Sequence, residues 1–311
     1  MTAVRRLVFA LIVGASFGWG SPLFAATPLR VVTVHTVLTE IAQTLGESDV
    51  DVLPLVAPGT DPHVYEPTPG DVRRFKEADL VLAAGLGMES YLPRLAGELR
   101  PDAIISVGDR LSPELLLKGG PHNHDGSHGH AHSHAHVDGV DPHWWHGVPQ
   151  VIAATHIVAN AFSERRPAQA GLFRARAESY VRRLESLRAW AKTEMAAIPA
   201  ERRVLVSSHD AFGYLAHEHS FTVYPLLGFS TAGEVDARHV ARIIRLIRAK
   251  NIHAVFSERS TSPRVIEAIV RETSAKLAPA LSADGLGRDP ALSTYEGMMR
   301  FNISTIVEAL R

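Results

Sequence analysis

Apolar runs alternate with helix-like repeats along the first third of the chain, and this alternation predicts a parallel α/β sheet. The apolar runs are short and rich in β-branched residues, as in buried strands, whereas the segments between them repeat at threes and fours. Strands that alternate with helices through short connections form parallel sheets covered by helices. Four strands are predicted at 29–36, 50–56, 80–84 and 103–107, and helices at 37–45, 67–76 and 91–99.

The middle of the chain predicts a shorter helix followed by a long one. Residues 148–165 have helical spacing. After Pro167, apolar side chains recur at threes and fours from about residue 168 to 197, and Pro199 ends the pattern. A helix of about 28 residues would extend ~42 Å at 1.5 Å per residue, which suits a rigid strut between two lobes.

The second half repeats the alternation, so we expect an α/β protein in which two (βα) lobes with parallel sheets are joined by one long rigid helix. Ligands of such folds bind at the carboxyl ends of the strands, and two lobes can place these ends across an interlobe cleft. Strands are predicted at 203–207, 221–227, 254–257 and 276–281, and helices at 209–217, 236–250, 263–274 and 294–310. The expected lobes are 27–166 and 199–311, with 167–198 as the linker helix.

The first residues predict a cleaved secretory signal peptide at 1–26. Arg5 and Arg6 form a short positive region, an apolar stretch follows, and small residues around Ala25 and Ala26 offer a cleavage site. The apolar stretch is shorter than the ~20 residues of a transmembrane helix. We therefore expect a soluble periplasmic protein. Because the sequence contains no cysteine, we expect no lipid attachment, no disulfide and no thiolate metal ligand.

Composition narrows the range of partners. The 311 residues include 32 basic and 33 acidic side chains with no block of basic residues, which argues against nucleic acid as a partner. An apolar share of 46% is enough to bury the cores of two domains. The unusual feature is the presence of 17 histidines, which directs attention to metal ions.

A segment rich in Gly and His at 119–140 has no apolar periodicity and is predicted to be a loop. Neutral imidazole is a common ligand for zinc, copper and nickel. The loop is therefore a candidate auxiliary metal site that feeds the main site or senses excess metal. The alternative is a dispensable low-complexity loop. Its histidines are His122, His124, His128, His130, His132, His134 and His136.

Four residues are candidate metal ligands, because each follows a strand or lies in a connection between elements, with two in each half of the chain. Both His63 and His143 end an Asp-Pro-His tripeptide, in which proline restricts the backbone ahead of the histidine. His209 follows a predicted strand directly, and Asp284 follows the last one. Three imidazoles and one carboxylate match a four-coordinate zinc site, whereas manganese prefers more oxygen ligands.

Four further residues are candidates for supporting the site. Glu66 and Glu258 are candidates to accept a hydrogen bond from a ligand histidine and so to determine its tautomer; the alternative is that they are ordinary surface or cap residues. His146 lies three residues after His143 and is either a supporting partner or a competing ligand. His35, at the end of the first strand, is a candidate to face the cleft.

Several long motifs then occur in one order: DPHVYEPTPGD, ADLVLAAGLGMESYLPRL, DPHWW, SSHDAFGYLA, FSERSTSPRVIEAIVRETSAKL and DGLG. From about residue 29 to the C-terminus, the chain resembles the metal-binding class of ABC solute-binding proteins, and most of all the zinc-binding ZnuA type within the TroA superfamily. The resemblance implies two (βα) lobes joined by a long helix. It also implies that His63, His143, His209 and Asp284 bind the metal.

One segment departs from the family pattern. After the second Asp-Pro-His, many members continue with Val-Trp-Leu-Asp-Pro, whereas this chain has Trp144, Trp145, His146 and Gly147. The role of His146 therefore stays open at this stage. The histidine-rich loop just before this segment resembles those of zinc-type members, which favours zinc over manganese.

The resemblance implies a high-affinity zinc-capturing component that delivers Zn²⁺ to an ABC permease, acts as a monomer and is not an enzyme. A periplasmic metallochaperone is a further candidate partner. Two alternatives stay open: Mn²⁺ or Fe²⁺ as the cargo, and a periplasmic zinc buffer or adhesin without a transport role. A zinc hydrolase is not favoured, because His-Glu-x-x-His does not occur and the single Gly-x-Ser-x-Gly match, Gly14–Gly18, lies in the predicted signal peptide.

Overall fold

The computed structural model describes residues 27–95, 97, 99–118 and 139–311. The predicted signal peptide at 1–26 lies outside these residues. The histidine-rich loop at 119–140 also lies outside them, apart from residues 139 and 140. None of its seven histidines is therefore among the described residues.

The N-terminal lobe is built on a four-stranded parallel sheet with the order β2-β1-β3-β4. Its central strands are almost wholly buried, as their continuous apolar runs predict. Helix α2 begins with a capping box between Thr68 and Asp71, and Pro69 occupies its first turn. The elements are β1 (Leu29–Thr33), α1 (Thr36–Gly46), β2 (Val50–Pro54), α2 (Pro69–Glu77), β3 (Leu80–Ala83), α3 (Leu92–Leu95) and β4 (Ile104–Ser106).

The C-terminal lobe contains two parallel strand pairs, β5-β6 and β7-β8. One helix differs from its prediction: α6 begins at Gly213, so His209 lies in the connection after β5 and not in a helix. In this connection the N–H groups of His209 and Asp210 bond to Glu258 and to the carbonyl of Gly228. The carbonyl of His209, which a helix beginning there would pair with the N–H of Gly213, accepts the Ser207 hydroxyl at 2.8 Å instead. The elements are β5 (Val204–Ser207), α6 (Gly213–His219), β6 (Thr222–Pro225), α7 (Ala237–Lys250), β7 (Ala254–Glu258), α8 (Arg264–Glu272), β8 (Lys276–Leu281) and α9 (Tyr295–Leu310).

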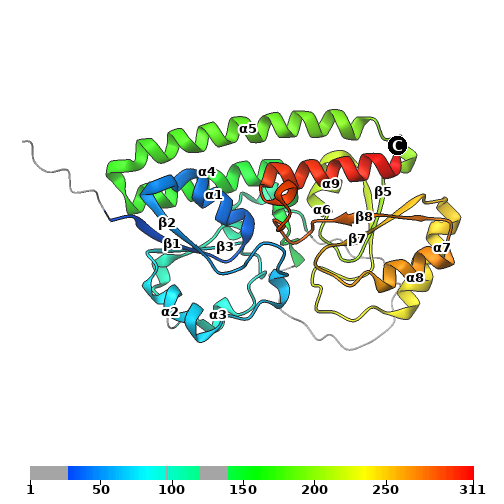
Figure 1. The fold of residues 1–311 in the computed structure, drawn as a ribbon, viewed down its shortest axis with the longest axis horizontal. Helices are drawn as coiled ribbons and strands as arrows, with labels where there is room; N and C mark the ends of the chain where they lie inside the picture. Colours follow the sequence, from blue (N-terminus) through cyan, green and yellow to red (C-terminus); the bar gives the residue numbers. More distant parts are fainter. Residues whose placement is uncertain (1–26, 96, 98, 119–138) are drawn as a thin grey trace, which may run out of the picture.

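Helix α4 (Val148–Arg165) is the last helix of the N-terminal lobe, and α5 (Ala170–Ala196) connects the two lobes. Figure 1 shows α5 along one edge of the molecule, beside α4 and α1 of the N-terminal lobe and beside α9 of the C-terminal lobe. Its 27 residues correspond to about 40 Å of helix. The predicted long helix is therefore confirmed, and it spans both lobes as a strut.

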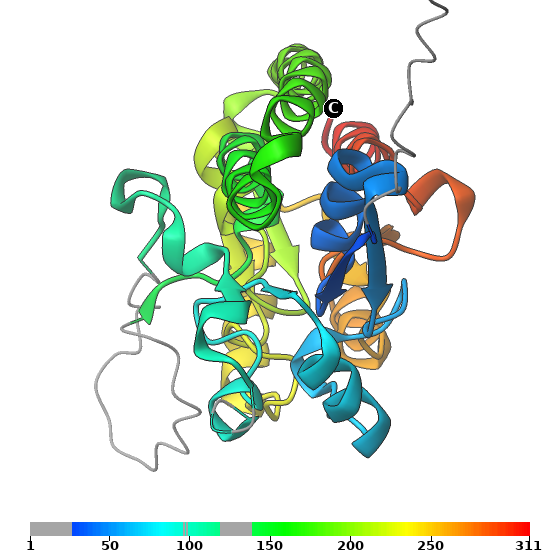
Figure 2. The same ribbon diagram turned by 90° about the vertical axis from the view of Figure 1, so that its left-hand side faces the viewer.

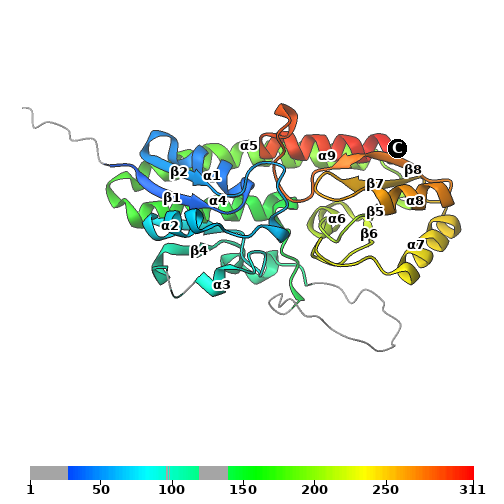
Figure 3. The same cartoon turned by 60° about the horizontal axis from the view of Figure 1, so that its bottom comes forward.

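The two lobes lie side by side along the long axis of the molecule, and the view along that axis shows α4, α5 and α9 grouped on one side of the strands (Figures 2 and 3). One apolar cluster continues from the N-terminal sheet through these helices into the C-terminal lobe, with Trp144 and Trp145 fully buried within it. Two smaller clusters lie under α2 and α3 and under α7 and α8. The lobes therefore share a packed junction.

Short 3-10 helices complete the described chain, and two of them carry or adjoin candidate ligands: η2 (Pro62–Val64) and η7 (Trp144–His146). The others are η1 (Glu47–Asp49), η3 (Pro101–Ala103), η4 (Gly108–Arg110), η5 (Pro113–Leu115), η8 (Pro167–Gln169), η9 (Ala200–Arg202) and η10 (Pro290–Leu292). Among the helices that the structure describes, none has the length and apolar character needed to cross a bilayer.

Candidate metal centre

The four candidate ligands meet at the junction of the lobes, although 221 positions separate the first from the last. His63 lies in η2 after β2, and His143 directly precedes η7. His209 and Asp284 follow β5 and β8. One ligand atom from each of the four lies within 4.8 Å of the others, and no other such group occurs among the described residues.

The donor atoms have the spacing that a small divalent cation needs. Nε2 of His143 lies 3.2 Å from Nε2 of His63 and 3.3 Å from Nε2 of His209. Oδ1 of Asp284 lies 3.4 Å from Nε2 of His63 and 3.3 Å from Nε2 of His209. The edge of a tetrahedron around zinc with bonds of 2.0–2.1 Å is about 3.3–3.4 Å. Four of the six donor pairs therefore have the spacing expected around a single zinc ion, and all four atoms lie within 4.8 Å of one another.

Both Asp-Pro-His segments orient their histidines through the aspartate. Asp61 accepts the backbone N–H of His63 at 2.9 Å, and Asp141 accepts that of His143 at the same distance. Asp141 also lies 2.9 Å from ring Nδ1 of His143, and a carboxylate accepts, so Nδ1 carries the proton and Nε2 keeps its lone pair. In the sequence, the proline of each tripeptide was the only residue taken to orient the histidine. The aspartate two residues before each histidine also indicates this, because an aspartate side chain commonly accepts a backbone N–H two residues further on.

His209 is oriented by Glu258, the last residue of β7. Oε1 of Glu258 accepts the backbone N–H of His209 at 2.9 Å, and Oε2 bonds to ring Nδ1. Both side chains are fully buried. Nε2 of His209 is thereby directed at the other three donor atoms, which is the supporting geometry expected for a glutamate beside a ligand histidine.

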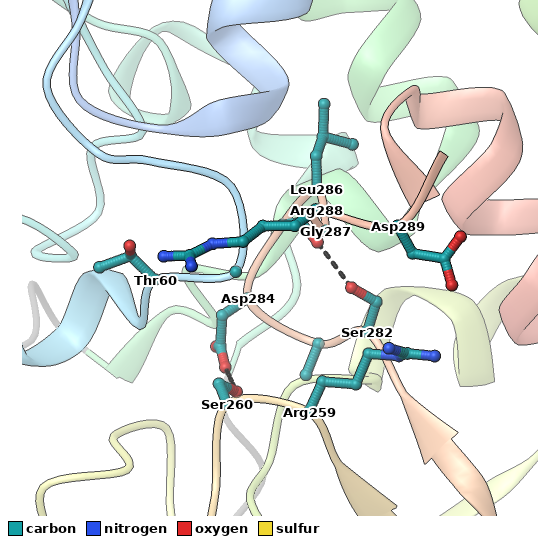
Figure 4. Close-up of a pocket in the computed structure, with 12 residues that line it drawn as sticks. Thr60, Arg259, Ser260, Ser282, Asp284, Leu286, Gly287, Arg288 and Asp289 are labelled. Carbon is teal, nitrogen blue, oxygen red and sulfur yellow. Dashed lines mark hydrogen bonds between the residues drawn. The ribbon is translucent and has the colours of Figure 1, made fainter. Parts of the chain in front are cut away.

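Asp284 has two oxygens in different surroundings. Oδ2 accepts a hydrogen bond from Ser260 Oγ, visible in Figure 4. Oδ1 is buried without a hydrogen-bond partner among the described residues and faces the histidines. The next residue, Gly285, has φ +121°, and a Cβ there would lie 2.3 Å from Oγ1 of Thr36. Glycine therefore permits the close approach of this loop to α1.

The electrostatics of the site favour a cation. Burial raises the pKa of Asp284, but His209 and His63 outweigh it and hold that pKa well below its usual range. Burial lowers the pKa of His143 well below the usual histidine value, and the neighbouring histidines reinforce this shift, so its imidazole is neutral. Burial also disfavours the charged form of His209, yet Glu258 and Asp284 together raise its pKa well above normal.

Two residues before α4, Trp145 and His146, hydrogen-bond to the loop that carries Asp284. Nε1 of Trp145 and Nε2 of His146 both hydrogen-bond to the carbonyl of Ala283, at 2.8 and 2.7 Å. Burial lowers the pKa of His146 to about 4, so its ring is a neutral donor at Nε2. These two hydrogen bonds fix the backbone next to Asp284. His146 is not among the four residues whose possible ligand atoms lie together.

The remaining two supporting candidates have other positions. Nδ1 of His35 caps α1 by accepting the N–H of Val37, and its ring lies 4.1 Å from that of Trp145, centroid to centroid. Burial lowers the pKa of His35 to about 3. Glu66 pairs with Arg94 at the surface, with 68% of its side chain exposed, so it is an ordinary surface residue and does not support a ligand histidine. Its proximity in sequence to His63 did not bring the side chain into the cleft.

Two openings flank the site. A pocket of about 420 Å³ is lined by Thr60, Ser260, Asp284 and Arg288, among others (Figure 4). A second pocket of about 280 Å³ is also lined by Ser260, together with Asp61 and Ser208 among others. Between the lobes, Oγ1 of Thr231 hydrogen-bonds to Oδ2 of Asp61 at 2.6 Å. The donor atoms are therefore enclosed but close to the surface of the interlobe cleft.

Comparison with known proteins gives one family. The family model described as "ZnuA: Zinc-uptake complex component A periplasmic" matches residues 31–309. The manganese-binding lipoprotein MntA of Bacillus subtilis is 32% identical over 317 residues, covering 100% of this chain and 98% of MntA. The zinc-binding protein TroA of Treponema pallidum is 31% identical over 316 residues, covering 98% of this chain and 96% of TroA.

The cargo differs among these relatives. The iron-binding protein YfeA of Yersinia pestis is 28% identical over 303 residues, covering 96% of this chain and 92% of YfeA. The solved structure of the periplasmic zinc-binding protein TroA from Treponema pallidum superposes with a TM-score of 0.82 at 29% identity, covering 91% of this chain and 99% of that one. The predicted fold class is thereby confirmed, and metal-ion binding is common to all these relatives.

Proposed function

Because the chain belongs to the ZnuA family of periplasmic metal-binding components of ABC transporters, we propose that its cargo is Zn²⁺, held with high affinity and delivered to a membrane permease. Members of this family bind a substrate for transport, so the prediction that the chain is not an enzyme is confirmed. The proposed zinc ligands are His63, His143, His209 and Asp284.

The donor set carries the proposal. Three imidazole nitrogens and one carboxylate oxygen, with neighbouring donors 3.2–3.4 Å apart, suit a four-coordinate zinc ion. The supporting carboxylates Asp141 and Glu258 each take the Nδ1 side of a histidine, which leaves Nε2 for the metal. Manganese favours six donors that are mostly oxygen.

Manganese or iron is the second candidate cargo, and the names of MntA and YfeA favour it specifically. Metal analysis of untagged protein, followed by competition between Zn²⁺ and Mn²⁺, separates the two. Clear preference for Mn²⁺ would refute zinc as the cargo and leave the transport role intact.

We propose that the mature protein is soluble in the periplasm after cleavage of residues 1–26. Several relatives are named lipoproteins, whereas this sequence contains no cysteine to which a lipid could be attached. The proposal also includes a monomer that docks on an ABC permease and receives metal from a periplasmic metallochaperone. Normal growth of a deletion strain under zinc starvation would favour a buffer or adhesin instead.

The decisive experiment is competitive Zn²⁺ titration of residues 27–311 against a chelator of known affinity. Three proteins are compared: the wild type, His63→Ala, and a variant lacking residues 122–136. One tight site that is lost in His63→Ala and retained in the deletion supports the interlobe site and makes the histidine-rich loop auxiliary. Loss of tight binding in the deletion alone would contradict the four-residue site.

A further inference from the structure

The carboxyl end of β7 carries no proposed ligand, yet it contacts two of them. Glu258, its last residue, bonds to His209. Two residues later, Ser260 bonds to Asp284. The intervening Arg259 points elsewhere, with its guanidinium 5.1 Å from the centroid of the Phe301 ring. Two alternate residues at the end of this strand therefore each hydrogen-bond to a proposed ligand: Glu258 to the histidine and Ser260 to the aspartate.

The backbone fixes the position of Ser260. Arg259 donates its N–H to the carbonyl of Leu281 at 3.0 Å, which ties this segment to the end of β8, three residues before Asp284. On the other side, the N–H of Thr261 bonds to the carbonyl of Glu258 at 3.3 Å and closes a tight turn. The hydroxyl of Ser260 is thus held beside one particular oxygen of Asp284.

We propose that Ser260 is a specificity-determining residue of the site, because its hydroxyl engages Oδ2 of Asp284 and leaves Oδ1 as the single carboxylate oxygen for the cation. This inference rests on the proposed metal-binding function of Asp284. Oδ1 is the oxygen that is buried, has no hydrogen-bond partner among the described residues and lies 3.3–3.4 Å from two imidazole nitrogens. The hydrogen bond therefore disfavours Oδ2 as a fifth protein donor.

Coordination number connects this bond to metal choice. Zinc is satisfied by four ligands in a tetrahedron, whereas manganese takes more ligands and prefers oxygen. A carboxylate that binds through both oxygens supplies one extra oxygen donor. Water supplies another, and the pocket of about 420 Å³ that adjoins Ser260 and Asp284 has room for it. Removal of the hydroxyl frees Oδ2 for either role and favours the larger coordination number.

The test compares the affinities of the mature protein for Zn²⁺ and Mn²⁺ in wild type, Ser260→Ala and Ser260→Thr. For Ser260→Ala we expect the ratio Kd(Mn)/Kd(Zn) to fall by about tenfold, the scale of effects seen when partners of metal ligands are removed. Ser260→Thr keeps a hydroxyl and should keep the ratio. Ser260→Gly also lacks the hydroxyl and provides a second variant should Ser260→Ala not fold. Ser262→Ala, in the same loop and without a contact to Asp284 in the described structure, is the matched control.

A spectroscopic measurement separates specificity from general damage. Co²⁺ replaces zinc readily, and tetrahedral Co²⁺ absorbs visible light far more strongly than five- or six-coordinate Co²⁺. We expect strong bands in the wild type and Ser260→Thr, and weakened bands in Ser260→Ala. An unchanged affinity ratio with an unchanged spectrum would overturn the proposal, as would an equal loss of both affinities. If the wild type prefers Mn²⁺, the assignment of zinc as the cargo is refuted. The proposal for Ser260 is still tested, because the change in Kd(Mn)/Kd(Zn) caused by Ser260→Ala is measured relative to the wild type.

Discussion

Glu258 accepts hydrogen bonds from both the backbone N–H and the ring Nδ1 of His209, across 49 positions of sequence. Both side chains are excluded from solvent. One carboxylate thus fixes the backbone, the tautomer and the ring orientation of a proposed ligand. Because both side chains are buried at the proposed site, a substitution at Glu258 should alter metal binding and leave the protein surface unchanged.

Glu258→Gln should weaken zinc binding by about 10–100-fold, the range found when partners of ligand histidines are changed. The amide keeps the size of the side chain but lacks the negative charge and has one acceptor oxygen instead of two. Competitive titration measures the effect. Glu234→Gln, an exposed change on the same lobe, is the control and should leave the affinity unaltered. Equal affinities for Glu258→Gln and wild type would contradict the supporting role.

Zinc affinity should rise with pH beyond the usual histidine pKa of about 6.5. Although burial opposes it, the carboxylates of Glu258 and Asp284 raise the pKa of His209, so the metal-free protein retains a proton there above that pH. Zinc must displace this proton, so the affinity falls about tenfold for each pH unit below the raised pKa. Calorimetry in two buffers of different ionisation enthalpy should show release of about one proton. A pH-independent affinity between pH 5 and 8 would refute this linkage.

Saturation with zinc should stabilise the fold, because the ligands come from both lobes. Zinc at a free concentration of about 1,000 times its Kd adds about 4 kcal/mol to the free energy of unfolding. Thermal unfolding with zinc, and again after removal by a chelator, measures the difference. His63→Ala should abolish most of it, whereas stabilisation that persists in this variant would place the metal elsewhere.

His146→Phe should leave one zinc bound per chain and change the free energy of unfolding by about 1 kcal/mol or less. The carbonyl of Ala283 keeps the hydrogen bond from Trp145 when that from His146 is lost. Phenylalanine also removes Nδ1 of His146, which is buried without a partner among the described atoms, and it preserves the ring packing on Phe212. Metal analysis and thermal unfolding test both parts. Loss of zinc binding on the scale of His63→Ala would instead make His146 a ligand.

Glu40→Ala should destabilise the junction of the lobes by about 1–3 kcal/mol. Glu40 of α1 accepts hydrogen bonds from the Tyr180 hydroxyl on α5 and from the backbone N–H of Tyr295 at the start of α9. Its removal leaves both donors unpaired in a buried region. Tyr180→Phe should cost about 1 kcal/mol, and Glu40 and Tyr180 should be coupled in a double-mutant cycle. Additive effects would show that the three helices are not linked through this carboxylate.

The sequence by itself determined the features that depend on local physical chemistry. Buried strands such as 80–84 are predictable because a short apolar run bounded by helix- and strand-breaking residues has few other possible conformations. The helix from about 168 to 197 is predictable because its apolar positions repeat with the helical period. The Asp-Pro-His segments identified His63 and His143 because the turn that presents each histidine lies within three residues.

Tertiary structure decided what depends on partners distant along the chain. Helix α6 begins at Gly213, and in the connection before it Glu258 and Gly228 accept the N–H groups of His209 and Asp210. Glu66, although close to His63 in sequence, turned to the surface and to Arg94. Ser260 reached Asp284 only through the pairing of β7 with β8. Local pattern limits which side chains a segment can present, but the packing of the two lobes selects the atoms that meet at the proposed metal site.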